Sequence, residues 1–213
     1  MIKSMFSKSS MFPNFSATAR DVDVLKTEII RKSIHFLIAL SPSIAAINRP
    51  FTVLFLMAGT LGYTLMENLR LSGVRVPVIS SLTDMASRPR DMGRFVMGPV
   101  TLGLGALLAL LLYPSPVAAI AIYALAFGDG FASLVGKFFG KWRPAFLYGK
   151  SIEGSLACFA VVLFSAYAVS GSLRIAFIAA FTATVVEALP LEDYDNLVLP
   201  VTVGLVVQLT GLL

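Results

Sequence analysis

Seven apolar segments dominate this sequence of 213 residues, and each is close to the length of a helix that crosses a membrane. A helix rises about 1.5 Å per residue, so about 20 residues cross a hydrocarbon core of about 30 Å. Hydrophobic residues make up 57% of the chain and charged residues only 14%, which is too apolar for a soluble domain of this size. We therefore predict an all-α fold, a polytopic membrane bundle of about seven transmembrane helices. The segments are residues 29–47, 51–67, 95–113, 117–135, 154–170, 173–189 and 197–213.

Three of the connections between these segments are very short and consist of turn-forming residues, namely 48–50, 114–116 and 171–172. Helices joined by two or three residues lie antiparallel to each other. Fifteen of the 17 Lys and Arg residues fall on one side of the predicted bundle, against Arg49 and Arg174 on the other. The positive-inside rule then places the N-terminus and the long loops in the cytoplasm and the C-terminus outside.

Residues 1–24 are polar and contain no long apolar run, so we expect a cytoplasmic arm rather than a cleavable signal peptide. Residues 25–213 are then a single transmembrane domain of an integral, multi-pass membrane protein. Acidic and basic side chains converge on its cytoplasmic face, which suits a site that meets a soluble anion from the cytoplasm and a lipid from the side. A transporter would place ionisable groups nearer the bilayer midplane.

The run from Gly128 to Lys141 has two ridges at i, i+4 spacing when it is drawn as a helix. The small-residue ridge is Gly128, Ala132, Gly136 and Gly140, and the polar ridge is Asp129, Ser133, Lys137 and Lys141. The first ridge predicts close packing against a partner helix, and the second predicts a surface for a charged ligand. A packing motif with an incidental aspartate is the alternative. A carboxylate at the membrane centre costs about 2.5–3.5 kcal/mol by insertion scales, which favours a function for Asp129.

Two charged clusters flank the first two segments. Arg31, Lys32 and His35 begin the first segment, with Arg31 and His35 one helical turn apart, a geometry suited to an anionic group at headgroup level. Snorkelling cations and a hydrogen-bonded histidine are the alternative explanation. Glu67 and Arg70 end the second segment at i, i+3 spacing, as either a surface ion pair or part of a site.

The segment Gly149-Lys150-Ser151 is similar to the end of a P-loop, but Pro144 stands where that motif requires glycine. It is therefore not a P-loop. Lys150 still supplies a positive charge, and Ser151 is a suitable N-cap for the next helix, with Glu153 in its first turn. The segment thus predicts an anion site at a helix N-terminus.

Acidic residues join the sixth and seventh segments without a basic neighbour. Glu187 is followed by residues 192–196, of which Asp195 and Asn196 lead directly into the last segment. Such oxygen-rich clusters suit Mg²⁺, which bridges phosphate oxygens. A solvated acidic loop is the alternative. With a single histidine and a single cysteine, the chain offers little for a zinc site.

Taken in this order, the motifs resemble those of the polyprenol kinase family, which includes dolichol, phytol and farnesol kinases and a CTP-dependent diacylglycerol kinase. The resemblance covers nearly the whole membrane region. It is carried by Arg31-Lys32-x-x-His35, Glu67-x-x-Arg70, Gly128-Asp129-Gly130-x-Ala132-Ser133-x-x-Gly136-x-x-x-Gly140, Lys150-Ser151-x-Glu153-Gly154-Ser155 and Asp195-Asn196-Leu197. The chain departs from the family where Tyr194 separates Asp193 from Asp195, because the family usually has adjacent carboxylates before the asparagine.

The resemblance implies a CTP-dependent lipid kinase that transfers the γ-phosphoryl group of CTP to the hydroxyl of a membrane lipid alcohol. The lipid is a polyprenol, phytol, farnesol or diacylglycerol, Mg²⁺ is the cofactor and CTP is the co-substrate. The functionally sensitive positions of the family correspond to Arg31, Lys32, Asp129 and Gly136. A triphosphate requires charge neutralisation more than covalent chemistry, and the cations and carboxylates of this chain suit that task.

These considerations assign roles to the candidate site residues. The predicted catalytic residues are Asp129, Lys150 and Glu153. The predicted nucleotide and phosphate ligands are Arg31, Lys32, Ser133, Gly136, Lys137, Lys141 and Ser151. The predicted metal ligands are Asp129, Glu187, Asp195 and Asn196. The predicted lipid-orienting residues are His35, Glu67 and Arg70. Asp129 is either a metal ligand or the base that accepts the hydroxyl proton, and the sequence does not separate these roles.

Two other functions remain open at this point. Phosphatidate cytidylyltransferase-type synthesis of a CDP-lipid also uses CTP, Mg²⁺ and a lipid. A non-enzymatic membrane transporter would show flux without consumption of nucleotide. In either enzymatic case we expect an active site on the cytoplasmic face and no nucleic-acid partner.

Overall fold

The computed structural model describes residues 19–211 except 75, 76, 78–80, 82, 84, 86–90 and 92. Within these residues the chain forms helices and no strand. Most of the predicted arm, residues 1–18, lies outside the described residues, and so does the predicted cytoplasmic loop around Ser80. The helices are α1 (Ala19–Leu37), η1 (Ile38–Leu40), α2 (Ser41–Leu71), α4 (Gly98–Leu112), α5 (Ser115–Tyr123), η3 (Ala124–Asp129), α6 (Gly130–Phe138), η4 (Ala145–Leu147), α7 (Ile152–Ser170), α8 (Leu173–Glu187), η5 (Glu192–Tyr194) and α9 (Asp195–Leu209).

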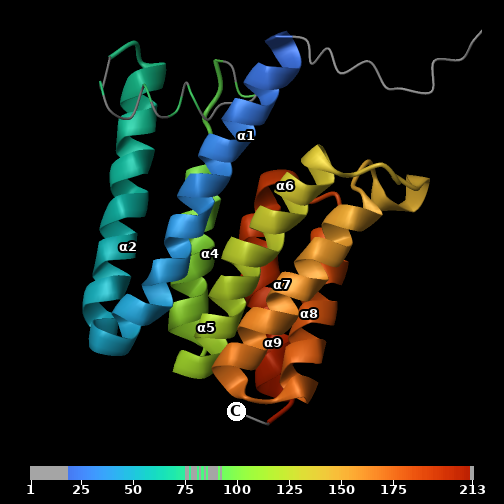
Figure 1. The fold of residues 1–213 in the computed structure, drawn as a ribbon. Helices are drawn as coiled ribbons and strands as arrows, with labels where there is room; N and C mark the ends of the chain where they lie inside the picture. The colour runs from blue at the N-terminus through green and yellow to red at the C-terminus, as the bar shows by residue number, and fades with distance from the viewer. Residues whose placement is uncertain are drawn as a thin grey trace, which may run out of the picture.

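Each predicted apolar segment corresponds to a helix or to a run of helices. The first two are joined through Asn48, whose φ of −150° and ψ of 95° interrupt the helix just before Pro50. The chain bends sharply there, and Figure 1 shows α1 and α2 diverging upward from the bend. The helix α1 begins at Ala19, ten residues before the predicted start at Ile29, because its first turns are polar and carry no hydropathy signal.

Three helical stretches are long and apolar enough to cross a membrane, namely Leu25–Leu71, Ser115–Phe138 and Ile152–Ser170. The first of them contains the bend. The helix α4 is apolar but shorter, and α8 and α9 have 15 residues each. The all-helical fold is therefore confirmed for the described residues, whereas seven spans and a cytoplasmic N-terminus remain predictions.

The helix α5 and the π-helix η3 form the centre of the bundle. Ile120, Ile122 and Leu125 from this run are at most 1% exposed. The helices α4, α7, α8 and α9 pack around it (Figure 1). Gly171 ends α7 with a φ of 64°, a conformation that glycine adopts without strain, and α8 then returns antiparallel to α7.

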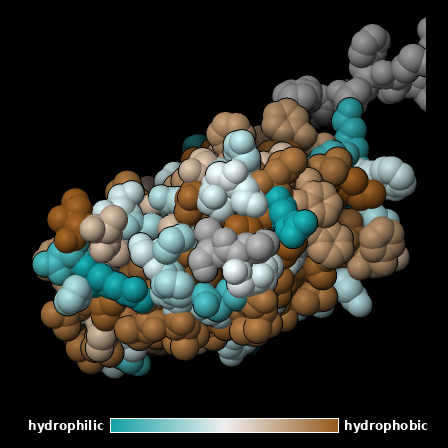
Figure 2. Space-filling view, turned by 90° about the horizontal axis from the view of Figure 1, so that it is seen from below, coloured by the Kyte–Doolittle hydropathy of each residue, from teal (hydrophilic) through white to brown (hydrophobic). Residues whose placement is uncertain are grey.

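The helix α2 is the least covered part of the bundle. It packs against α4, yet Leu54, Phe55, Leu61 and Leu65 are each at least 60% exposed. Such a continuous apolar face is unfavourable in water and suits contact with lipid. Seen end-on from below, hydrophobic side chains cover most of the flanks of the molecule, and hydrophilic ones gather over the end itself (Figure 2).

Arg49 fastens the bend to the lower end of α4. Its guanidinium donates hydrogen bonds to the carbonyl oxygens of Leu110 and, at 2.9 Å, of Tyr113. These carbonyl groups belong to the last turn of α4 and the residue after it, where a helix leaves acceptors without partners. The charged site described next lies at the opposite end of the bundle, where α6 and α8 end and α7 and α9 begin (Figure 1).

Candidate active site

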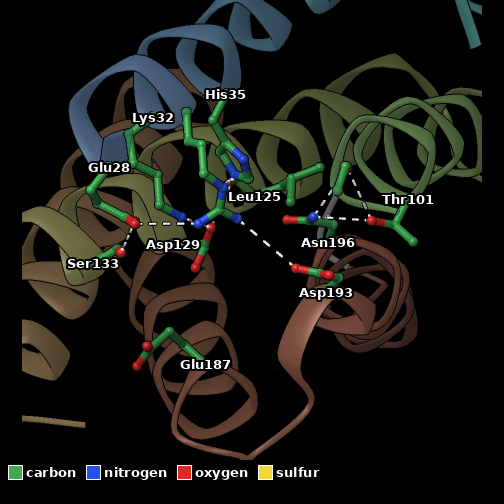
Figure 3. A network of polar contacts seen from close by, with 12 residues as sticks. Glu28, Lys32, His35, Thr101, Leu125, Asp129, Ser133, Glu187, Asp193 and Asn196 are labelled. Atoms are coloured by element: carbon green, nitrogen blue, oxygen red, sulfur yellow. Dashed lines mark hydrogen bonds and ion pairs between the residues drawn. The ribbon is translucent and has the colours of Figure 1, made fainter. Parts of the chain in front are cut away.

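Asp129 is the centre of a polar network at the upper end of the bundle (Figure 3). The Nζ atom of Lys32 donates to its Oδ2 atom at 2.5 Å, and Nε2 of His35 lies 3.2 Å from the same oxygen. The Nε2 atom also lies 2.9 Å from the carbonyl oxygen of Leu125, which only accepts, so this nitrogen carries the proton. Asp129 is 6% exposed. A carboxylate this deeply buried is tolerated because it is paired.

The π-helix η3 places Asp129 at this position. Asp129 is the last residue of η3 and directly precedes α6. A π turn disturbs the usual i to i−4 pairing of the backbone, and the carbonyl oxygen of Leu125 in this turn faces the ring of His35. Single π turns inside α-helices are frequent at functional sites.

Glu28 belongs to the network and was missed by the sequence analysis. It is 1% exposed, and its carboxylate accepts from Ser133 Oγ at 2.5 Å, from Lys137 Nζ at 2.5 Å and from Arg31 Nη1 at 3.2 Å. The charged residues of α1 recur at i, i+3, i+4 and i+7 from Glu28, which is one face of a helix. That spacing is the sequence signal that could have revealed it. The polar ridge of α6 therefore faces the charged face of α1.

The small-residue ridge packs against α7, as its spacing predicted. A Cβ atom on Gly136 would lie 3.0 Å from Ser151 Oγ, and one on Gly154 would lie 2.7 Å from the carbonyl oxygen of Ala132. The distance at Gly154 leaves no space for a side chain, and the distance at Gly136 is tighter than an ordinary contact. This close contact, which we call the α6–α7 seam, brings the N-terminus of α7 against the helix that carries Asp129.

The N-terminus of α7 forms one wall of the site. Ser151 is its N-cap, as predicted, and its Oγ atom accepts from the backbone N–H of Gly154 at 3.1 Å. The Oγ atom of Ser155 is buried and has no hydrogen-bond partner among the described residues. The backbone N–H groups of Ile152, Gly154 and Ser155 already have acceptors. The dipole at this helix N-terminus still favours an anion, and the unpartnered Ser155 hydroxyl lies in the first turn.

Lys150 connects the start of α7 to the end of α8. Its Nζ atom lies 3.0 Å from Glu187 Oε1 and also donates to the backbone carbonyl of Glu187. Glu187 is 5% exposed, and in the part of the chain that the structure describes its Oε2 atom has no hydrogen-bond partner. A buried carboxylate oxygen without a donor is unfavourable, so it is available to a cation in the site.

The start of α9 forms the third wall. The Nδ2 atom of Asn196 donates to Thr101 Oγ1 at 3.1 Å, which ties α9 to α4. Asp195 is the first residue of α9, and Arg31 Nη2 lies 3.9 Å from Asp193 Oδ1 in the preceding turn. Carboxylate and amide oxygens therefore face the cationic side of α1 (Figure 3).

These walls surround a cavity of about 230 Å³, which we call the polar cavity. Side chains of both signs line it, and most of the predicted site residues are among them. The lining residues are Arg31, Lys32, Asp129, Ala132, Ser133, Gly136, Lys137, Arg143, Gly149, Lys150, Ser151, Gly154, Ser155, Glu187, Glu192, Asp193, Asp195 and Asn196. Arg143 was not predicted, and its guanidinium donates to the carbonyl oxygens of Gly136 and Gly149 at 2.5 and 2.6 Å.

Two predicted residues lie outside the wall of the polar cavity, Lys141 on the segment after α6 and Glu153 in the first turn of α7. The helix α6 ends at Phe138, so Lys141 lies beyond it and is exposed. The Glu153 carboxylate accepts the backbone N–H groups of Lys141 and Trp142 at 3.0 and 3.2 Å. Glu153 thus orders this segment, and the structure does not bring either residue to Asp129.

Glu67 and Arg70 also lie apart from the polar cavity. Glu67 is fully buried and accepts two hydrogen bonds from Arg70, at 2.8 and 2.7 Å, and one from the backbone N–H of Val96 at 3.0 Å. Glu67 and Arg70 therefore do not form a surface ion pair. The pair attaches the end of α2 to the residues that precede α4.

The described residues include no group of three or more His, Cys, Asp or Glu side chains placed to hold a metal ion. Asp129, Glu187 and Asp195 nevertheless line the same polar cavity, where the Oε2 atom of Glu187 has no donor. Mg²⁺ commonly binds one or two carboxylates together with substrate phosphates and water. The donor set fits a Mg²⁺ ion bound together with a nucleotide better than a preformed metal cage.

The fold and the site define a class of protein, an apolar helical bundle with a polar cavity of mixed charge at one end. Comparison with known proteins narrows that class. The chain is 28% identical over 155 residues to "Probable phytol kinase 1, chloroplastic" of Oryza sativa subsp. japonica, an alignment that covers 64% of this chain and 49% of the relative. It is 27% identical to "Probable phytol kinase, chloroplastic" of Triticum aestivum, covering 59% and 48%, and 26% identical to "Probable phytol kinase 1, chloroplastic" of Glycine max, covering 62% and 50%.

These three relatives are named as phytol kinases, and they support the polyprenol kinase family as the family that the chain resembles. The chain spans about half the length of the curated relatives it matches. No family model and no solved structure matches it.

Proposed function

We propose that this chain is a lipid-alcohol kinase that transfers the γ-phosphoryl group of CTP to the hydroxyl of a membrane lipid, with Mg²⁺ as cofactor. The similarity to proteins named phytol kinases supports the chemistry and the class of acceptor. The observation that carries the proposal is Asp129, a buried carboxylate held by Lys32 and His35 at the edge of a cavity that also has a cationic wall.

The cationic wall is the proposed site of the triphosphate. Lys137 and Lys150 line the polar cavity, together with Ser151, the N-cap of α7. Charge-assisted hydrogen bonds from such groups stabilise the charge that spreads over the phosphoryl oxygens in the transition state. The unpartnered Ser155 hydroxyl supplies a further donor. Arg31, on α1, lines the same cavity opposite the acidic turn.

Asp129 is the proposed acceptor of the hydroxyl proton. Lys32 and His35 fix its carboxylate. Both residues also line a second, largely apolar pocket, from which the lipid hydroxyl would reach Asp129. The hydroxyl oxygen forms a bond to the γ-phosphorus, the bond from that phosphorus to the β-phosphate oxygen breaks, and CDP leaves. Glu187 and Asp195 would hold Mg²⁺, which when bound neutralises phosphate charge.

Synthesis of a CDP-lipid from phosphatidate is the second candidate, because it would use the same nucleotide and metal. Labelled CTP separates the two reactions. Purified protein in lipid nanodiscs receives CTP labelled at either the α- or the γ-phosphate, with a panel of phytol, farnesol, a polyprenol, diacylglycerol or phosphatidate. We expect γ-label in a lipid alcohol, no α-label in any lipid, loss of transfer with a chelator, and weaker transfer from ATP.

The contradicting result is equally specific. If phosphatidate acquires the α-label and no lipid alcohol acquires the γ-label, the chain is a cytidylyltransferase and the kinase proposal is wrong. The Asp129→Asn variant controls for a contaminating kinase, because label that persists unchanged in that variant does not come from this site.

A further inference from the structure

An apolar space adjoins the polar cavity behind α1. This space, which we call the inner pocket, has a volume of about 290 Å³. Four residues line both this space and the polar cavity, so the two spaces meet at their side chains. They are Arg31, Lys32, Asp193 and Asn196. The rest of the wall of the inner pocket is mostly apolar, with Pro99 and Leu102 among its residues, and also includes Thr83 and Asp91. The inner pocket therefore has mixed polarity, and Pro99 and Leu102 also line the uncharged space that follows it.

A second apolar space continues from the inner pocket between α1, α2 and α4. It has a volume of about 470 Å³, and we call it the outer groove. Its wall has Ile34, Leu37, Tyr63, Pro99 and Leu102 in common with the inner pocket, and no charged side chain lies among the described residues that line it. The three spaces thus follow one another from the phosphate site to the open side of α2.

The outer groove has the dimensions of one membrane leaflet. It follows α2 from Thr52 to Tyr63, which is about 16 Å at the rise of an α-helix. Half of a hydrocarbon core is about 15 Å. A lipid with its polar end at the junction of the two cavities would therefore extend its tail through the leaflet next to the polar site.

We propose that the inner pocket and the outer groove bind the hydrocarbon tail of the lipid-alcohol substrate, which enters from the membrane between α1 and α2. This inference rests on the kinase function proposed above. The hydroxyl group would lie beside Lys32 and His35, next to Asp129, and the tail would lie along α2. A charged or peptide ligand would leave its polar groups unpaired in this groove, whereas a hydrocarbon chain requires no partners there.

Gly59 allows the groove to be filled without disturbing the protein. It lines the outer groove, and a Cβ atom built on it meets no heavy atom within 4 Å. Gly62 lies one turn further along α2, has the same open surroundings, and lines neither apolar space. Both glycines are inside the helix, where leucine is a better helix former than glycine. Gly62→Leu is therefore a matched control for Gly59→Leu.

The test compares these two variants with isoprenoid alcohols of increasing length, from geraniol through farnesol and phytol to a polyprenol. We expect Gly59→Leu to raise the KM for phytol and longer alcohols by about tenfold or more, because the leucine occupies the space of the tail. The KM for geraniol and the KM for CTP should stay within about twofold of the parent chain. Gly62→Leu should behave as the parent with every alcohol.

A phytol analogue with a photoreactive group at the end of its tail gives a readout that requires no catalysis. We expect crosslinks to the α2 peptide around Gly59, reduced by excess phytol and by Gly59→Leu. Crosslinks to α7 or α8, or crosslinks to α2 that phytol does not displace, would overturn the proposal and mark the groove as a site of bulk lipid or of a second copy. If the parent chain phosphorylates no alcohol while the α2 crosslink is displaced by phytol, the kinase function fails and the tail site stands.

Discussion

Glycines of the α6–α7 seam and glycines on the open face of α2 have opposite surroundings. In the α6–α7 seam, a Cβ atom on Gly154 would lie 2.7 Å from the carbonyl oxygen of Ala132, and one on Gly136 would lie 3.0 Å from Ser151 Oγ. On α2, a Cβ atom on Gly59 or Gly62 would meet nothing within 4 Å. The seam therefore holds the helix that follows Asp129 in a fixed position against α7. The outer groove, in contrast, leaves space between α1, α2 and α4 for an apolar ligand.

The largest effect is expected at Asp129, which directly precedes α6, one of the two helices of the α6–α7 seam. Asp129→Asn keeps the shape of the side chain and removes the charge that Lys32 and His35 hold. We expect turnover to fall by at least about a hundredfold, the scale of a positioned acid–base group, while the protein stays monodisperse. Initial rates with γ-labelled CTP and size-exclusion chromatography measure both quantities.

A titration with Mg²⁺ separates the two roles of Asp129. If Asp129 accepts the proton, the maximal rate of the variant stays low at saturating Mg²⁺. If Asp129 is instead a metal ligand, the variant recovers rate at higher Mg²⁺. Near-normal turnover in a well-folded Asp129→Asn protein would remove this residue from the site and, with it, the main support for the kinase proposal.

Alanine at the two kinds of glycine tests the comparison itself. In Gly154→Ala the new methyl group meets the carbonyl oxygen of Ala132 at 2.7 Å, so a helix must shift. We expect a loss of about 1–3 kcal/mol of stability, as for other overpacked sites. Gly59→Ala should be neutral or should stabilise by up to about 1 kcal/mol through helix propensity. Thermal unfolding of both variants in the same detergent measures the difference, and equal melting temperatures would show that the seam is looser than described.

The next largest effect is expected for a substitution of Glu187, because the Oε2 atom of its carboxylate is buried without a donor. Glu187→Gln should raise the Mg²⁺ concentration for half-maximal activity by about tenfold. Glu153→Gln is the matched control, since the Glu153 carboxylate accepts backbone N–H groups outside the polar cavity. We expect no change in its Mg²⁺ requirement. A shift in the Glu153 variant as large as that in the Glu187 variant would place the metal at the start of α7 instead.

Periodicity predicted those parts of the site that depend on one helix at a time. The small-residue ridge that starts at Gly128 packs against a partner helix, α7, as predicted. The polar ridge that starts at Asp129 lies against α1, and its role as a surface for a charged ligand stays a prediction. The N-cap at Ser151 was also correct. These features are local, because i, i+4 spacing and capping are properties of a single segment.

Features that depend on where a helix ends, or on which helices meet, could not be predicted in this way. The pattern extended α6 to Lys141, but the helix ends at Phe138. The π turn before Asp129 has no sequence signature that separates it from an α-helix. Glu28 was missed because it precedes the apolar segment in which α1 was recognised, although its spacing to Arg31 was visible. The outer groove was not visible at all, since it depends on the angle at which α2 leaves the bend at Asn48.

The smallest effect is expected for the two lysines of the polar ridge. It tests whether the nucleotide site ends with α6 or extends along the segment after it. Lys137 is in α6 and lines the polar cavity, whereas Lys141 lies beyond the helix end and does not. The Lys137 side chain is 36% exposed, so its contact with a phosphate should contribute only about 1 kcal/mol, or about fivefold in the KM for CTP. Lys137→Gln should therefore raise that KM by about fivefold, and Lys141→Gln should leave it within about twofold. Steady-state kinetics with varied CTP at saturating lipid alcohol measures both. A larger effect at Lys141 would mean that the segment after Phe138 closes over the nucleotide, and the boundary of the site would then move from the end of α6 to Glu153.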